Sequence, residues 1–302
     1  MIGVFDSGHG GLTILRALVA ASPRRSFLYL GDHALAPYGN RPPEEIYRLT
    51  QAAVIHLFER GCRLVVLACN TAAAVSLRRL QQEWLPHAYP DRRILGVLVP
   101  MVEAVTGVPW MADPAQHSAE DPSPRTVAVF ATRQTVLSNA YPIEIGKRAP
   151  QIRVVQQACP KLVDLIEAGG RRNALEEAVL LYVGQLLHKL SGEVPDFAML
   201  GCTHYPLIAD IFAQALPPGV EILSQPTLVA RSLEDYLCRH PQFDPLVPAA
   251  GGKPQILFST TGAADRISEL ASHFFGHALR FEQVHVTPQD SGRRAVERAV
   301  GE

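Results

Sequence analysis

The sequence has little of what marks an extracellular, membrane-bound or nucleic-acid-binding protein. Its five cysteines are an odd number without a CxxC pair or zinc-site spacing, so neither a disulfide framework nor a metal site is expected. No apolar run reaches about eighteen residues, and the start MIGVFDSG lacks the basic segment and apolar core of a signal peptide. Charged residues make up 19% and the formal net charge is −1, without the basic excess of a nucleic-acid-binding protein. We therefore expect a soluble, reduced, cytoplasmic protein that binds neither membranes nor nucleic acid.

Short apolar runs alternate with amphipathic stretches of helical length along most of the chain. The runs do not alternate strictly between apolar and polar residues, which favours parallel strands covered by helices on both faces. About nine such units exceed what one compact open sheet holds, so we predict two α/β domains. The predicted strands are residues 2–5, 26–30, 64–68, 93–98, 126–131, 152–156, 196–200, 220–224 and 255–259.

Three segments interrupt this rhythm. Residues 107–125 are rich in proline and polar side chains and are predicted to form an exposed insertion loop. Residues 241–254 are predicted to form a second loop, and the polar tail after residue 287 is expected to fray.

Polar residues follow the predicted strands in both halves of the chain. In open α/β sheets ligands bind beyond the carboxyl ends of the strands, so these positions are the first place to look for a site. Hydroxyls, amides and helix N-terminal N–H groups there form anion-binding cups, and the scarcity of Lys and Arg favours small carboxylates over polyphosphates. No lysine is among them to form a Schiff base, so pyridoxal phosphate is not expected. The positions are Asp6, Ser7, Gly8, Gly31, Asp32, Tyr38, Gly39, Asn40, Cys69, Asn70, Thr71, Thr132, Cys159, Cys202, Thr203 and His204.

Cys69 and Cys202 each end a predicted strand and precede a predicted helix. Asn70 or Thr71 is suited to cap the first helix, and Pro206 to occupy the first turn of the second. Because a helix N-terminus stabilises a thiolate, both thiols are predicted to have a lowered pKa.

The other cysteines fit a simpler interpretation, since a buried lone cysteine is usually a small apolar core residue. We interpret Cys62 and Cys238 in this way. Cys159 ends a strand, but its sequence neighbours offer no base.

Several polar residues near these cysteines have two interpretations. The turn DSGHGG is not a GxGxxG motif, and Asp6 could simply cap it. His204 could pair with the Cys202 thiolate or cap its own helix, and Glu167 by default would be a solvated charge at a helix end. The histidines left as structural are His9, His33 and His56.

Four ordered motifs, FDSGHGGL, YLGDHALAPYGNR, LACNTAAA and MLGCTHYP, closely resemble those of the glutamate racemases. These are cofactor-independent enzymes of the aspartate/glutamate racemase superfamily. FATRQTVLSNAY, ACPKLVDLIEAG and FSTTGAADRISELASHFFG extend the likeness from residue 2 to about residue 286. The resemblance implies two pseudo-symmetric α/β domains with mainly parallel sheets and an active site in the cleft between them. Residues 1–98 with 211–302 would form the first domain, and residues 99–210 the second.

The resemblance also assigns roles to individual residues. It implies that Cys69 and Cys202 are two acid/base thiols, with Cys69 deprotonating D-glutamate and Cys202 deprotonating L-glutamate. Asp6 is expected to assist Cys69 and His204 to assist Cys202, and Glu167 matches the family's second carboxylate. The positions that match the family's substrate-binding residues are Asp6, Ser7, Tyr38, Gly39, Asn70, Thr71, Thr132, Thr203 and His204.

The chain departs from the family pattern at three places. His9 stands where the family usually has an apolar residue, so the turn after Asp6 is expected to differ in polarity. Ala73 replaces a common serine, and the 107–125 loop is longer than usual.

The resemblance implies that the protein interconverts L- and D-glutamate without a cofactor and acts as a homodimer. The D-glutamate would be supplied for peptidoglycan synthesis in the cytoplasm. Racemisation is best carried out by two acid/base groups on opposite sides of Cα, because the α-proton leaves one face of this carbon and a proton returns to the other. Three alternatives stay open: a racemase for another amino acid such as aspartate, a hydrolase or amidase with a cysteine nucleophile, and a non-catalytic carboxylate-binding module.

Overall fold

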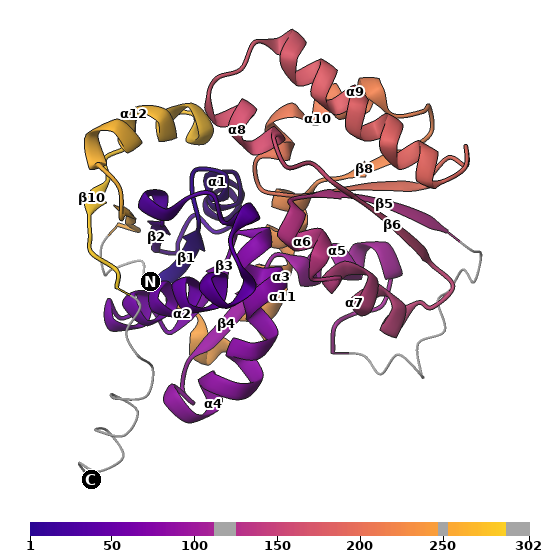
Figure 1. Ribbon diagram of the computed structural model, residues 1–302. Helices are drawn as coiled ribbons and strands as arrows, with labels where there is room; N and C mark the ends of the chain where they lie inside the picture. The colour runs from indigo at the N-terminus through magenta and orange to yellow at the C-terminus, as the bar shows by residue number, and fades with distance from the viewer. Residues whose placement is uncertain (112–124, 247–252, 288–302) are drawn as a thin grey trace.

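The computed structural model describes residues 1–111, 125–246 and 253–287. The predicted α/β class is confirmed, and a strand forms in each of the nine predicted runs. Two parallel sheets result (Figure 1). The first runs in the order β10 (Glu282–Gln283), β9 (Ile256–Thr260), β2 (Phe27–Gly31), β1 (Ile2–Asp6), β3 (Leu64–Leu67), β4 (Arg93–Gly96). The second runs in the order β6 (Arg153–Ala158), β5 (Thr126–Ala131), β7 (Phe197–Gly201), β8 (Glu221–Leu223).

The strand order of the second sheet repeats part of the first. The arrangement β2-β1-β3-β4 corresponds to β6-β5-β7-β8, so β1 matches β5 and β3 matches β7. The connections turn in opposite directions on either side of the pair β1/β3 in the first sheet and of the pair β5/β7 in the second, which opens a crevice beyond the ends of these strands. Cys69 follows β3 and Cys202 follows β7, so each thiol lies at the crevice of its own sheet.

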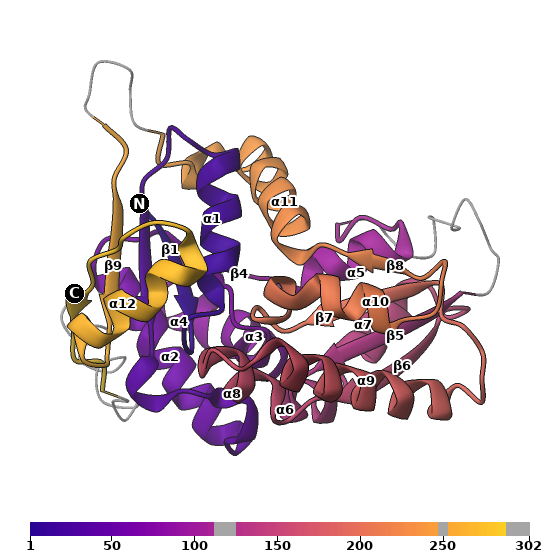
Figure 2. The same ribbon diagram turned by 90° about the horizontal axis from the view of Figure 1, so that it is seen from above.

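Helices cover the sheets, and each sheet with its helices forms one lobe of the molecule. Seen from above, the first lobe, with the six-stranded sheet, and the second lobe, with the four-stranded sheet, lie side by side (Figure 2). No helix in the described ranges is long and apolar enough to cross a membrane. The α-helices are α1 (Gly11–Ala21), α2 (Pro43–Glu59), α3 (Asn70–Arg79), α4 (Leu85–Ala88), α5 (Leu98–Thr106), α6 (Arg133–Leu137), α7 (Ala140–Arg148), α8 (Leu162–Glu167), α9 (Arg172–Lys189), α10 (Ala209–Ala215), α11 (Gln225–Arg239) and α12 (Ala264–Phe275).

The interior of each lobe is apolar. Every residue of β1, β2 and β3 is buried, as expected for strands covered on both faces. In the second lobe, Phe130 of β5 packs against Phe212 of α10 with ring centroids 5.0 Å apart. These cores give the strand ends rigid supports.

The chain crosses between the lobes later than the sequence predicted. Residues 211–302 were expected to complete the first domain, but β8 pairs with β7, and the preceding helix α10 packs on α9 of the second lobe. The return to the first lobe is made by α11, which packs against α1. The run at 220–224 has no local feature that selects one sheet over the other. Within the predicted insertion loop, residues 112–124 lie outside the described residues, as do 247–252 and the tail from 288.

Candidate active site

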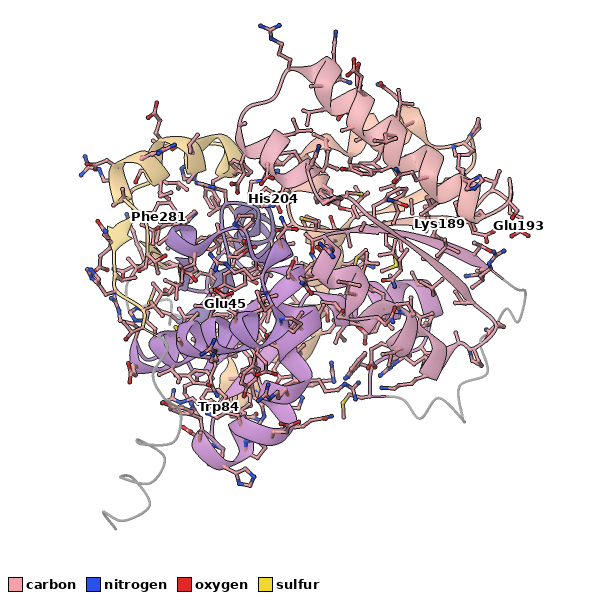
Figure 3. All side chains as sticks on the ribbon, in the orientation of Figure 1. Glu45, Trp84, Lys189, Glu193, His204 and Phe281 are labelled. Atoms are coloured by element: carbon pink, nitrogen blue, oxygen red, sulfur yellow. The ribbon has the colours of Figure 1, made fainter. Side chains whose placement is uncertain are left out.

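The strand ends of the two lobes surround one narrow cleft. Both predicted acid/base thiols line it, one from each lobe. Figure 3 places His204 where the lobes meet. Among the predicted site residues, those lining the cleft are Ser7, Tyr38, Gly39, Cys69, Asn70, Thr71, Thr132, Glu167, Cys202, Thr203 and His204.

Cys69 is itself the N-cap of α3, a position that the sequence assigned to Asn70 or Thr71. Its sulfur accepts a hydrogen bond from the Ala72 N–H at 3.4 Å, and the Ser7 hydroxyl lies 3.3 Å from it. The expected lowering of its pKa is wrong. Burial, with the nearby charge of Asp6, raises the pKa of the Cys69 thiol to about 12, because these effects outweigh the hydrogen bonds to the sulfur.

Asp6 lies behind the cleft wall and joins the two lobes. Its carboxylate accepts hydrogen bonds from the Gly8 N–H at 2.8 Å and from the Thr203 hydroxyl at 3.3 Å. The Thr13 hydroxyl donates to the Thr203 carbonyl at 3.0 Å. A Cβ at Gly10 would lie only 2.3 Å from the Thr203 hydroxyl oxygen, so this close approach requires glycine. The turn after β1 therefore packs directly on the loop that carries the second thiol.

Cys202 is the first member of a chain of three polar side chains. Its sulfur lies 3.8 Å from Nδ1 of His204, and Nε2 of His204 lies 2.8 Å from Oε1 of Glu167. Burial by itself lowers the pKa of His204, but the hydrogen bonds with Cys202 and Glu167 outweigh it and raise that pKa to about 10. Burial also opposes ionisation of Glu167, yet its hydrogen bonds with His204 and His9 hold its pKa well below the usual range. The arrangement therefore favours an imidazolium at His204 beside the Cys202 sulfur.

Hydroxyl groups from both lobes meet across the cleft. The Thr71 hydroxyl lies 2.9 Å from that of Thr132. A Cβ at Gly39 would approach Cβ of Thr132 to 3.0 Å, so the backbone of the first lobe lies close to the second here as well. The Tyr38 hydroxyl donates to Asp32 at 2.6 Å and is thereby turned toward its own lobe. The threonine pair gives the cleft neutral donors suited to a carboxylate.

The geometry can be set beside known proteins. No protein-family model matches the chain. A glutamate racemase from Phenylobacterium zucineum is 46% identical over 285 residues, covering 93% of this chain and 99% of that protein. One from Paracoccus denitrificans is 46% identical over 286 residues, covering 93% and 98%. This chain belongs to the glutamate racemase family. It is therefore related to amino-acid racemases along nearly its whole length.

Solved structures of glutamate racemases share the fold. Isoform RacE1 from Bacillus anthracis superposes with a TM-score of 0.79 at 28% identity, covering 95% of this chain and 97% of that one. The Francisella tularensis enzyme in complex with D-glutamate gives 0.78 at 26% identity, covering 95% and 98%. The two-lobed architecture of this chain is thus that of the glutamate racemase family.

Asn70, next to the first thiol, is held by residues that the sequence did not indicate. Its side-chain carbonyl accepts from Tyr141 at 2.9 Å and from Gln225 at 3.0 Å, and its amide donates to the carbonyl of Gln225 at 2.8 Å. Gln225 is fully buried and opens α11, where the chain re-enters the first lobe. No sequence signal connects Asn70 to a partner 155 positions away.

Two further groups lie near the site without a role there predicted from the sequence. His9, interpreted as structural, lies 3.3 Å from Glu167 through its Nδ1. Cys159 lines the cleft, and burial together with the neighbouring Cys202 raises the pKa of its thiol. All five cysteines are free, and the described residues contain no cluster of His, Cys, Asp or Glu suited to a metal ion.

Proposed function

We propose that this chain interconverts L- and D-glutamate by proton transfer between two thiols, without a cofactor. Two findings support the proposal: relatives 46% identical over nearly the whole chain are glutamate racemases, and the thiols lie on opposite lobes around one cleft. The shared cleft is the observation that carries the mechanism, because racemisation needs a proton acceptor on one face of Cα and a donor on the other.

In the direction from L to D, the Cys202 thiolate removes the α-proton. The electron pair of the broken C–H bond spreads into the α-carboxylate, and the Cys69 thiol delivers its proton to the opposite face. Cys202 is then a thiol and Cys69 a thiolate, which is the starting state for D-glutamate. The imidazolium favoured at His204 suits the thiolate role, and burial raises the pKa of Cys69 to about 12, which keeps it protonated.

The carbanion needs more help than proton transfer alone, which contributes ~10²–10⁴-fold. We propose that donors at the strand ends bind the carboxylates and stabilise the charge that develops on them. The hydroxyls of Ser7, Thr71, Thr132 and Thr203 line the cleft, as does the start of α3. In a cleft largely closed to water, each such hydrogen bond is worth more than in solvent.

The family relationship also supports a cellular role. We propose that the product D-glutamate is supplied for peptidoglycan synthesis in the cytoplasm, and that the protein acts as a homodimer. Gel filtration with light scattering tests the dimer.

Incubation of the purified protein with L-glutamate in D₂O, with no cofactor added, tests the activity. We expect loss of the Cα proton signal together with decay of the circular dichroism of the substrate. Exchange with L-aspartate but not L-glutamate would make the chain a racemase of the other substrate. Binding without exchange would overturn the proposal in favour of a carboxylate-binding module. A covalent acyl-enzyme formed from an amide or ester, with Cys69 dispensable, would indicate a hydrolase.

A further inference from the structure

His9 is an enclosed histidine in the turn between β1 and α1. Its Nδ1 lies 3.3 Å from Oε1 of Glu167, which belongs to the second lobe. Its ring stacks on Phe274 of α12 with centroids 5.3 Å apart, and only 5% of the residue is exposed. A polar side chain so fully enclosed is held in one orientation, and here it reaches across the lobe boundary.

Glu167 uses the same oxygen for two histidines. Oε1 is 2.8 Å from Nε2 of His204 and 3.3 Å from Nδ1 of His9. An ionised carboxylate only accepts, so both ring nitrogens that face it carry protons. Phe274 also contacts both rings, stacking on His9 and meeting His204 edge-on at 5.8 Å. The two histidines thus share one carboxylate and one aromatic wall.

We propose that His9 is a positioning residue for the second thiol. Its N–H holds the Glu167 carboxylate with Oε1 directed at His204, and this keeps the proton of His204 beside the Cys202 sulfur. An apolar residue at position 9 cannot donate this hydrogen bond. The role rests on the proposed racemase function, because it acts through the thiol that the mechanism uses as a base.

The other titratable neighbours of His9 do not replace it. The ring of His33, which follows β2, has its centroid 4.3 Å from that of His9. Its Nδ1 is hydrogen-bonded within the first lobe, with the Thr260 hydroxyl at 2.8 Å and the Gly31 carbonyl at 3.1 Å. Burial, followed by the charge of His9, lowers the pKa of His33 to about 3, so this ring is neutral at working pH. His204 and Glu167 are the partners already described, and Asp6 is held by Gly8 and Thr203.

The first test measures kcat/KM for L-glutamate from pH 6 to 10. His9→Phe keeps an aromatic ring against Phe274 but removes the donor, and we expect kcat/KM to fall on the order of tenfold, the usual effect of losing a hydrogen bond to a charged group. The basic limb should move to lower pH because His204 loses its fixed acceptor, while KM changes little because His9 does not line the cleft. His9→Leu is the second donor-free variant if the Phe ring is not accommodated.

Two controls separate the donor from packing. His9→Asn places an amide N–H near the position of Nδ1, and it should restore kcat/KM to within about threefold of wild type and return the basic limb, since the hydrogen bond is regained. His56→Leu removes a half-buried histidine of α2 outside the cleft and should leave the profile unchanged. Equal profiles for wild type and His9→Phe, or equal impairment of His9→Phe and His9→Asn, would overturn the positioning role.

A second readout does not need racemisation. In a Cys69→Ser background, the rate of alkylation of Cys202 by iodoacetamide, mapped by mass spectrometry across pH, reports its thiolate. His9→Phe should shift this curve and His9→Asn should not. If wild type does not racemise glutamate but the curve shifts as expected, the proposed function fails, and what stands is the effect of His9 on the Cys202 thiolate. If racemisation occurs and neither readout responds to His9→Phe, the role of His9 fails alone.

Discussion

Replacing Glu167 with glutamine removes a charge from the Cys202–His204–Glu167 chain while keeping its shape. The glutamine carbonyl can still accept the hydrogen bond that Nε2 of His204 donates at 2.8 Å. What is lost is the attraction between a carboxylate and an imidazolium. The variant therefore tests whether the proton on His204 depends on this charge.

The size of the effect follows from the pKa of His204, which is raised from 6.5 to about 10. At 1.36 kcal/mol for each pKa unit, the partners favour the protonated ring by about 5 kcal/mol. Burial opposes protonation, so Cys202 and Glu167 together supply at least this much. If the Glu167 carboxylate supplies about half of this free energy, Glu167→Gln makes protonation of His204 less favourable by about 2 kcal/mol. The pKa of His204 then falls by between one and two units.

The measurement is kcat/KM for L-glutamate as a function of pH, followed by circular dichroism. The imidazolium is present below its pKa and lost above it, so the basic limb should move from near pH 10 in wild type to about pH 8–9 in the variant. At pH 9 the variant should be about two- to tenfold slower, and the two should converge toward pH 7.

Glu193→Gln is the matched control for this experiment. Glu193 is an exposed carboxylate paired with Arg153 and lies far from His204 (Figure 3). Titration of the substrate affects the control and Glu167→Gln equally, so only the difference between them is interpreted. A basic limb that stays at the wild-type position in Glu167→Gln would refute the argument that Glu167 holds the proton on His204.

Three further changes test the site and its supports. Cys69→Ser and Cys202→Ser should each lower racemisation by ~10³-fold or more in both directions, and near-wild-type turnover of either variant would exclude the two-thiol mechanism. Gln225→Leu leaves the buried amide of Asn70 short of partners and should lower the free energy of unfolding by about 1–3 kcal/mol in urea titrations, whereas an unchanged midpoint would show that the pair is dispensable. Gly10→Ala places a Cβ 2.3 Å from a side-chain oxygen of the loop after β7, so the thermal unfolding midpoint should fall by the equivalent of about 1–3 kcal/mol. A midpoint equal to that of wild type would show that the turn can shift to accommodate the methyl group.

The site is less symmetric than the fold. The same strand order places Cys69 and Cys202 at equivalent positions, after β3 and β7. Their neighbours differ, because a hydroxyl from Ser7 contacts the first sulfur and the ring of His204 faces the second. One thiol is thereby suited to start as the proton donor and the other as the acceptor.

Local pattern alone determined much of this protein. The nine strand-forming runs and the placement of both thiols at strand ends follow from apolar runs and helix starts, which are properties of neighbouring residues. Those features were sufficient to predict a two-part parallel α/β fold and most of the strand-end positions that line the cleft, whereas Glu167 of α8 was indicated only by the family resemblance.

Tertiary structure decided the rest, because it depends on which segments become neighbours. Only the folded chain assigns β8 to the second sheet, buries Cys69 enough to raise its pKa, and brings Gln225 to Asn70. It also brings His9 to within 3.3 Å of Glu167, 158 positions away in the chain. Hydrogen bonds and burial of this kind leave no periodic trace in a sequence, since each partner is locally compatible with many other surroundings.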